Sequence, residues 1–107
     1  MALYNSKNIG KVYLAAGAIN ETEGVVGIGT SGALAMTLPN PPSAHFGMLV
    51  IVATTAQAHT VTNTTGFNAG STSSDVGTFG GAIGDSLILV AIGGVWYVVG
   101  NTNVTLA

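Results

Sequence analysis

Two apolar segments separated by a pair of glycines dominate the hydrophobic pattern of the chain. They occupy residues 85–100, are rich in β-branched and aromatic side chains, and meet at Gly93-Gly94. Only glycine adopts positive φ at both central positions of a two-residue turn without strain, so the pattern predicts a β-hairpin closed there. In the predicted register Ile92 pairs with Val95.

Both faces of this hairpin are apolar. One face carries Leu87, Leu89, Ala91, Trp96 and Val98, and the other carries Ile88, Val90, Ile92, Val95, Tyr97 and Val99. An antiparallel ribbon with one solvated face alternates apolar and polar residues, so we expect both faces to be covered. A chain of 107 residues can cover one face with its own second sheet, but a domain of this size buries only about two-thirds of its unfolded surface. We expect the second face to meet another subunit or a larger assembly, with Ile88, Val90, Ile92, Tyr97 and Val99 as interface residues.

Shorter alternating segments predict further strands, and no stretch shows the periodicity of a helix. Residues 39–42, which contain three prolines, end one of them, and the Gly/Ser/Thr-rich residues 65–84 resemble a loop. The predicted strands are residues 11–16, 25–30, 33–38, 47–54, 58–64 and 103–107. The strand at residues 47–54 is also apolar on both faces, with Met48, Val50 and Val52 on one face and Leu49, Ile51 and Ala53 on the other. Many short strands predict an all-β fold, a small antiparallel β-sandwich that is jelly-roll-like or barrel-like. We expect one domain over residues 11–107, preceded by an extended N-terminal arm over residues 1–10.

The composition narrows the possible functions. Only 6% of the residues are charged, and two lysines against four acids give a net charge of −2, which argues against nucleic-acid binding through phosphates. The chain has no cysteine, so neither a disulfide nor a thiolate zinc site supports the fold. So few charges give little electrostatic repulsion between copies of the chain, so we expect an oligomer.

The high mean hydropathy, +0.57, raises the question of a membrane. The longest strongly apolar run, residues 87–99, is shorter than the roughly 20 residues of a spanning helix and contains two glycines. Residues 12–19 are too weakly apolar for the core of a signal peptide. We therefore expect no membrane partner and synthesis in a cytoplasm without an export signal.

Candidate chemical motifs are weak. Residues 27–32 match G-x-G-x-x-G, the pattern of a dinucleotide-binding site. Such a site needs a helix after the last glycine and an acidic residue about 20 positions further on. Here a proline-rich turn follows instead of a helix, and no acidic residue lies at that distance. His45 and His59 lack partners at ligand spacing, and a hydrogen-bonded structural role is expected for His59. Asp85 follows a glycine and is expected to stabilise a turn. The sequence predicts no catalytic residue, no metal site and no cofactor, and hence no enzyme.

The sequence also contains three glycosylation sequons and a pair of adjacent aromatic residues. The sequons at Asn20, Asn63 and Asn103 are expected by chance in a chain rich in Asn and Thr. Trp96 and Tyr97 suggest a sugar platform, but adjacent strand residues point to opposite faces, so packing is the expected role of both.

Several segments together resemble bacteriophage virion proteins. They are Met36-Thr-Leu-Pro39, Leu49-Val-Ile-Val52, Ala58-His-Thr-Val-Thr62, Phe79-Gly-Gly, Gly84-Asp-Ser-Leu87, Gly94-Val-Trp-Tyr-Val98 and Val104-Thr-Leu-Ala107. The pattern covers roughly residues 33–107 and is similar to that of head decoration (cement) proteins, and also to tail-fibre and baseplate modules. The resemblance implies a β-sandwich protomer, often trimeric, bound to the major capsid protein on the outer surface of the virion. It implies no active site.

Two functions from different classes therefore stand as hypotheses. The leading one is a capsid decoration protein that binds the assembled head and stabilises it. The alternative is a tail-fibre or baseplate module that binds host carbohydrate, for which residues 65–84 would have to supply an exposed cluster such as Phe67, Asn68 and Asp75. A hydrolase would need a nucleophile–base pair that the sequence does not offer.

Overall fold

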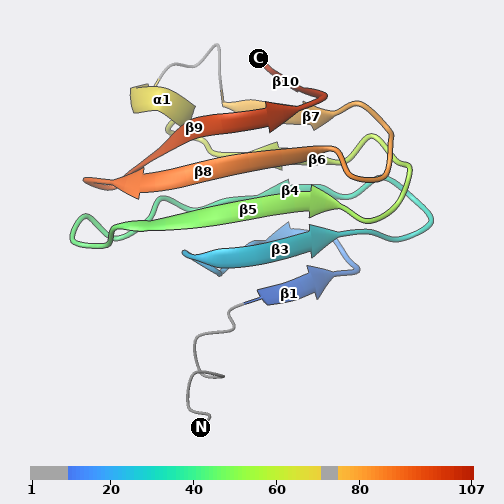
Figure 1. Ribbon diagram of the computed structural model, residues 1–107, viewed down its shortest axis with the longest axis horizontal. Coiled ribbons are helices and arrows are strands. Elements are labelled where there is room, and N and C mark those ends of the chain that lie inside the picture. Colours follow the sequence, from blue (N-terminus) through green and yellow to red (C-terminus); the bar gives the residue numbers. More distant parts are fainter. Residues whose placement is uncertain (1–9, 71–74) are drawn as a thin grey trace, which may run out of the picture.

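The computed structural model describes residues 10–70 and 75–107, which form two stacked five-stranded sheets (Figure 1). Sheet A consists of β1 (Gly10–Tyr13), β3 (Gly24–Ile28), β5 (Gly47–Ala53), β8 (Ser86–Ile92) and β9 (Val95–Thr102), in that spatial order. Sheet B consists of β10 (Val104–Leu106), β7 (Val76–Phe79), β6 (Thr60–Thr62), β4 (Ala35–Thr37) and β2 (Gly17–Ala18), also in spatial order. The expected all-β sandwich is confirmed.

The strand directions differ in part from the antiparallel sandwich that the sequence predicts. From β1 to β6 the chain crosses from one sheet to the other after every strand, so β1, β3 and β5 pair in parallel, as do β2, β4 and β6. The crossover that parallel strands require is supplied here by a strand of the opposite sheet. The N-terminal part of the chain therefore winds back and forth between the two sheets. Both sheets contain parallel as well as antiparallel strand pairs.

The C-terminal half is antiparallel and contains the predicted hairpin. Gly93 and Gly94 have φ values of 60° and 83°, and Ile92 pairs with Val95 across the turn. A β-bulge interrupts the register beside Ile88, because Ile88 pairs with Gly100 and Val99 is the extra residue. The remaining pairs, β5–β8, β6–β7 and β7–β10, are also antiparallel.

Residues 65–84 contain more structure than the sequence predicted. They include β7 and the four-residue helix α1 (Phe67–Gly70), the one helix of the described residues. Gly10, expected in the arm, belongs to β1, and residues 1–9 lie outside the described residues. The Asn68 side chain, beside β9, accepts a hydrogen bond from the Val98 backbone N–H through its Oδ1 (2.9 Å). The helix therefore covers part of the outer edge of sheet A.

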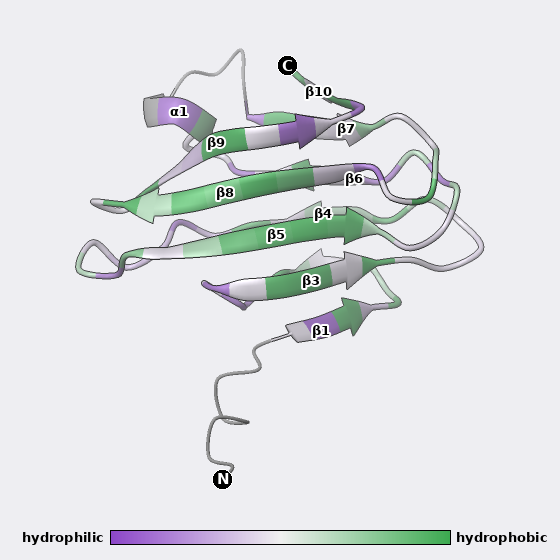
Figure 2. Cartoon of the chain, viewed as in Figure 1, coloured by the Kyte–Doolittle hydropathy of each residue, from purple (hydrophilic) through white to green (hydrophobic). Residues whose placement is uncertain are grey.

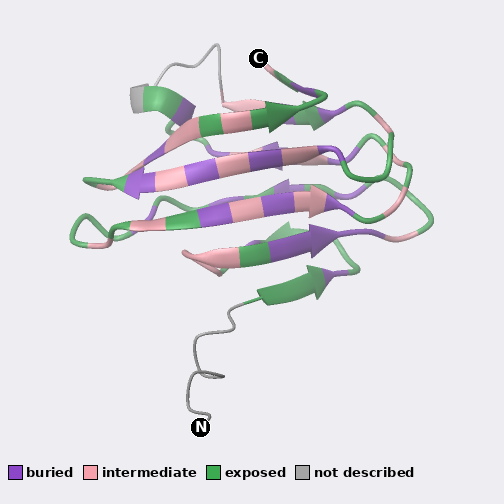
Figure 3. Cartoon of the chain, in the orientation of Figure 1, coloured by how far each residue is buried: buried purple, intermediate pink, exposed green. Residues whose placement is uncertain are grey.

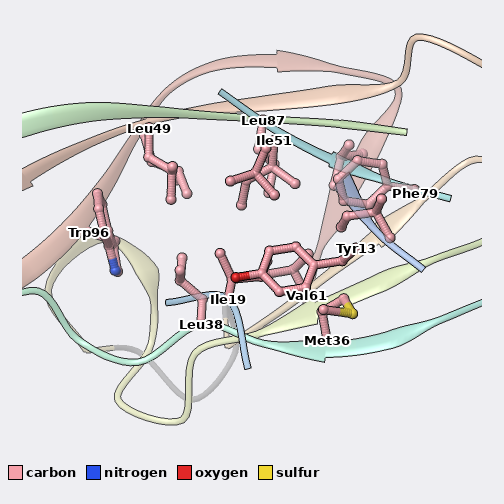
Figure 4. Close-up of a cluster of buried hydrophobic side chains, with 14 of the residues drawn as sticks. Tyr13, Ile19, Met36, Leu38, Leu49, Ile51, Val61, Phe79, Leu87 and Trp96 are labelled. Atoms are coloured by element: carbon pink, nitrogen blue, oxygen red, sulfur yellow. The ribbon is translucent and has the colours of Figure 1, made fainter. Parts of the chain in front are cut away.

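The hydrophobic core fills the space between the sheets (Figure 4). Sheet A contributes residues that alternate with its outward positions, and sheet B and the connections close the core from the other side. The largest fully buried apolar side chains are Ile19, Ile28, Met36, Leu38, Leu49, Ile51, Phe67, Phe79, Leu87, Leu89 and Trp96. The expected inner face of the hairpin is confirmed, since Leu87, Leu89, Ala91 and Trp96 are fully buried and Val98 packs against the core.

Candidate functional site

The outer face of sheet A is the candidate functional site. It is the face turned away from sheet B, and its strands are apolar at inward and outward positions alike (Figure 2). Along β5 and β8 buried residues alternate with outward residues that are only partly covered (Figure 3). The outward positions, given by this alternation and the strand register, are Gly10, Val12, Val25, Gly27, Met48, Val50, Val52, Ser86, Ile88, Val90, Ile92, Val95, Tyr97, Gly100 and Thr102, with Val99 at the bulge. No charged residue is among them.

The five expected interface residues all lie on this face, although the structure contains no partner that tests their role. Ile88, Val90 and Tyr97 are half-buried by their neighbours, whereas Ile92 and Val99 are 46% and 59% exposed. Ile88 lies over Gly100, where a Cβ atom would come within 2.9 Å of its Cδ1 atom. Because residue 100 is glycine, the Ile88 side chain can lie across it, and this part of the face stays flat.

The face extends beyond the hairpin that the sequence singled out. It continues across β5 to the exposed side chains of Met48, Val25 and Val12, at 54%, 55% and 52% exposure. Sequence reasoning placed Met48 on the second apolar face of its strand but did not connect Val25 and Val12 with it. The clue in the sequence was Val12, which lies next to Tyr13 and therefore points to the opposite side of its strand. This clue becomes useful only when β1, β3 and β5 are known to pair in parallel.

The outer face of sheet B has a different character. Its outward positions carry mainly threonine and alanine, namely Ala18, Ala35, Thr37, Thr60, Thr62, Val76, Thr78 and Thr105. Hydroxyl groups there remain compatible with water. Of the two outer faces, only that of sheet A carries the large apolar side chains that gain most from being covered.

His59 has the structural role that the sequence predicted. Its ring is fully buried, its Nδ1 accepts a hydrogen bond from the Leu34 backbone N–H (3.0 Å), and its Nε2 lies 3.0 Å from Thr55 Oγ1. Because Nδ1 is an acceptor, the ring proton of the neutral form is on Nε2, which donates to Thr55. Burial lowers the pKa of His59, and the hydrogen bond with Thr55 opposes that shift. The neutral ring connects the loop before β4 to the loop before β6.

His45 lies in the loop before β5 and holds neighbouring segments together. Its Nε2 is 2.9 Å from the Thr22 carbonyl oxygen and 3.9 Å from Glu23 Oε1. The ring also lies against Gly47, where a Cβ atom would be 2.7 Å from Nε2. His45 therefore fastens the loop before β5 to the loop before β3.

Asp85 stabilises a turn, as the sequence predicted. Its Oδ2 accepts a hydrogen bond from the Ala82 backbone N–H (2.9 Å), and both carboxylate oxygens lie 3.2 Å from Asn103 Nδ2. The hydrogen bond from Ala82, with that from Asn103, holds the pKa of Asp85 below its usual value. Asn103 has a φ of 58°, so this contact also fixes the left-handed turn between β9 and β10.

The glycine-rich motif of residues 27–32 serves packing. Gly27 and Ile28 belong to β3, and a Cβ atom at Gly29 would collide with the Thr54 hydroxyl. Thr54 in turn donates a backbone hydrogen bond to the Ile28 carbonyl (2.8 Å). The glycines allow the end of β3 to approach β5 closely, and no helix begins there.

The aromatic residue proposed for a carbohydrate site does not lie on the surface. Phe67 is fully buried, whereas Asn68 is exposed and Asp75 half-buried, and the Asn68 Oδ1 accepts its hydrogen bond from β9. Trp96 is also fully buried, with its Nε1 donating to the Pro39 carbonyl oxygen (2.9 Å), while Tyr97 points to the outer face. Asn63, of one sequon, is 1% exposed and donates to the Leu38 carbonyl oxygen.

Within residues 10–70 and 75–107, no group of three or more His, Asp or Glu side chains could hold a metal ion. In the same part of the chain, no helix is long and apolar enough to cross a membrane. Comparisons of the chain with models of protein families, with curated proteins and with solved structures found no match. The outer face of sheet A is thus the feature from which a function can be inferred.

Proposed function

We propose that this protein is a structural subunit of a bacteriophage particle, which binds the outside of the assembled head as a decoration protein and works without catalysis. The observation that carries the proposal is the outer face of sheet A, a wide apolar surface that residues 10–70 and 75–107 leave uncovered and without a charge. Such a surface is typical of a protein that works by contact.

The energetics favour a contact function over solvent exposure of this face. Each 100 Å² of apolar surface removed from water contributes about 2.5 kcal/mol before the entropic cost of association. Since the face carries no charge, salt screens little of this contribution. A particle subunit whose contacts are made in this way would keep them when the ionic strength around the particle changes.

The placement on a phage head comes from the resemblance of residues 33–107 to decoration proteins. It makes the major capsid protein the proposed partner, a homotrimer the proposed assembly and the outer surface of the virion the proposed location. The arrangement of the histidines and Asp85 supports a role without chemistry, because His59 and Asp85 are used to hold loops together.

The test uses particles from a phage that encodes the protein. Its copy number per particle is measured by quantitative mass spectrometry, and genome release on heating is compared between complete particles and particles from a gene deletion. We expect hundreds of copies, and depleted heads that stay closed but release DNA at a lower temperature. Adding the purified protein back should restore the release temperature.

Two results would refute the decoration role. One is an unchanged release temperature in the depleted particles. The other is a count of a dozen or so copies, which would place the protein in the tail and favour the fibre or baseplate alternative.

A further inference from the structure

We infer that the whole outer face of sheet A, from β1 to β9, is the surface through which copies of this chain pack against one another. The inference deepens the proposed function and rests on its homo-oligomeric assembly. It names a single partner, a further copy of this chain, and a surface that extends well beyond the β8–β9 hairpin.

The first argument is the position of the charges. Lys11 lies in β1 but points to the inner side, with its Nζ 4.7 Å from the centre of the Tyr13 ring. Glu21 and Glu23 lie in the loop between β2 and β3, and Asp85 lies in the turn before β8. Within residues 10–70 and 75–107 the face is therefore uncharged, and the uncharged surface of a further copy is a partner that leaves no charge buried without a counterion.

The second argument is shape. Valine and isoleucine side chains dominate the outward positions, glycine at residues 27 and 100 lowers the surface between them, and stacked sheets pack about 10 Å apart through side chains of this kind. The inner face of the same sheet already packs in this manner against sheet B. The outer face repeats the pattern, and the described part of the chain supplies no second layer over it.

The third argument is area. Five strands spaced about 4.8 Å apart and roughly 20 Å long give a flat footprint on the order of 500 Å², which the projecting side chains increase. A stable interface covers about 800 Å² on each partner. The two hairpin strands alone provide about two-fifths of the footprint, so only the complete face approaches the required area.

Two methionines provide a readout that needs no substitution. Met48 lies on the outer face and is 54% exposed in the single chain, whereas Met36 is in the core and is 1% exposed. Hydrogen peroxide oxidises accessible methionine to the sulfoxide, and mass spectrometry of the peptides measures both rates. We expect Met48 to be protected like Met36 at high protein concentration and to react at least about tenfold faster on dilution, as copies dissociate.

A matched pair of variants tests the face itself. Val50→Lys places a charge at the centre of the face, on the middle strand of sheet A, and Thr62→Lys places the same charge on the middle strand of sheet B. We expect Val50→Lys to weaken self-association by about a hundredfold or more, because the ammonium group would be buried without a partner. Thr62→Lys should leave the assembly intact, and slow oxidation of Met36 shows that each variant is folded.

The inference is supported if Met48 is protected in the wild-type chain and in Thr62→Lys but reacts rapidly in Val50→Lys at every concentration. It is overturned if Met48 reacts rapidly in the concentrated wild-type protein, or if Thr62→Lys exposes Met48 as much as Val50→Lys does. Fast oxidation in a protein that still binds heads would refute the inference alone. Protection of Met48 in a protein that does not bind heads would refute the proposed function alone.

Discussion

Replacing Trp96 with alanine is expected to lower the free energy of unfolding by about 3–5 kcal/mol, the range for removing a buried aromatic side chain. The indole is fully buried between the sheets, beside Leu49 and Leu38 at one end of the core (Figure 4). Its Nε1 also donates to the Pro39 carbonyl oxygen, 57 residues away in the chain. The substitution therefore leaves a cavity and removes a hydrogen bond that holds the proline-rich loop.

Urea unfolding of wild-type and variant at one protein concentration measures this loss, because the stability of an oligomer depends on concentration. The control is Trp96→Phe, which keeps most of the ring volume and removes the hydrogen bond; it should lose clearly less than the alanine variant. If Trp96→Ala costs under about 1 kcal/mol, the indole is not part of a packed core and the facing of the hairpin is wrong.

Acidification below pH 6.5 is expected to weaken the fold through His59. Burial makes the folded-state pKa of this ring lower than its value in the unfolded chain, which is about 6.5. The unfolded state therefore binds the proton more readily. The stabilisation is fully present above pH 6.5 and declines as the pH falls from 6.5 to the folded-state pKa, by at most about 1.4 kcal/mol per pH unit for one proton.

The structural reason is the contact between His59 and Leu34. The Leu34 backbone N–H donates to the unprotonated Nδ1 of His59. Protonation of Nδ1 would replace this acceptor with a second donor, so the hydrogen bond would be lost. The free energy of unfolding, measured from pH 8 to pH 5, should fall on the acid side in the wild-type chain. The fall should disappear in His59→Gln, whose amide does not titrate, and remain in His45→Gln; an equal fall in both variants would contradict the role of His59.

Asp85 adds a second acid-sensitive contact at lower pH. Its folded-state pKa is held below the value in the unfolded chain, so its stabilisation is present above about pH 3.8 and is lost as the pH falls through the folded-state pKa. Both groups change stability in the same direction, and the loss that depends on Asp85 begins at a lower pH than the loss that depends on His59.

The hairpin was predictable from the sequence because its determinants are local. A glycine pair at residues 93 and 94 fixes the turn, and the two-residue side-chain period then fixes which residues point inward. The same period separates the two faces of β5 and of β4, and the structure shows that the faces carrying Leu49, Ile51 and Met36 are the buried ones.

The strand directions were not predictable in the same way. Parallel pairing in the N-terminal half depends on the chain crossing to the other sheet after each strand. β2 has only two residues and gives no periodic signal, and the alternation that marks β4 and β6 as strands does not show which sheet each one joins. β7 was missed because its sequence, Val-Gly-Thr-Phe, includes a glycine that reads as a breaker. In the structure Gly77 makes room for Leu87 and Val104, whose side chains lie 3.2 and 3.3 Å from where its Cβ would be.

The full extent of the candidate site was not predictable either, because it depends on the same parallel strand pairing. The apolar outward residues of the hairpin and of β5 were visible in the sequence, but their union with Val25 and Val12 requires the parallel register of β1, β3 and β5. What the sequence presented as two separate apolar strands is one continuous face.

The central claim is that this face is covered by further copies of the chain, and the mass of the unmodified protein in solution tests it most directly. Sedimentation equilibrium at micromolar concentration should give a multiple of the 10.6 kDa chain mass, three times that value for the proposed trimer. A single 10.6 kDa species throughout the micromolar range would contradict the account.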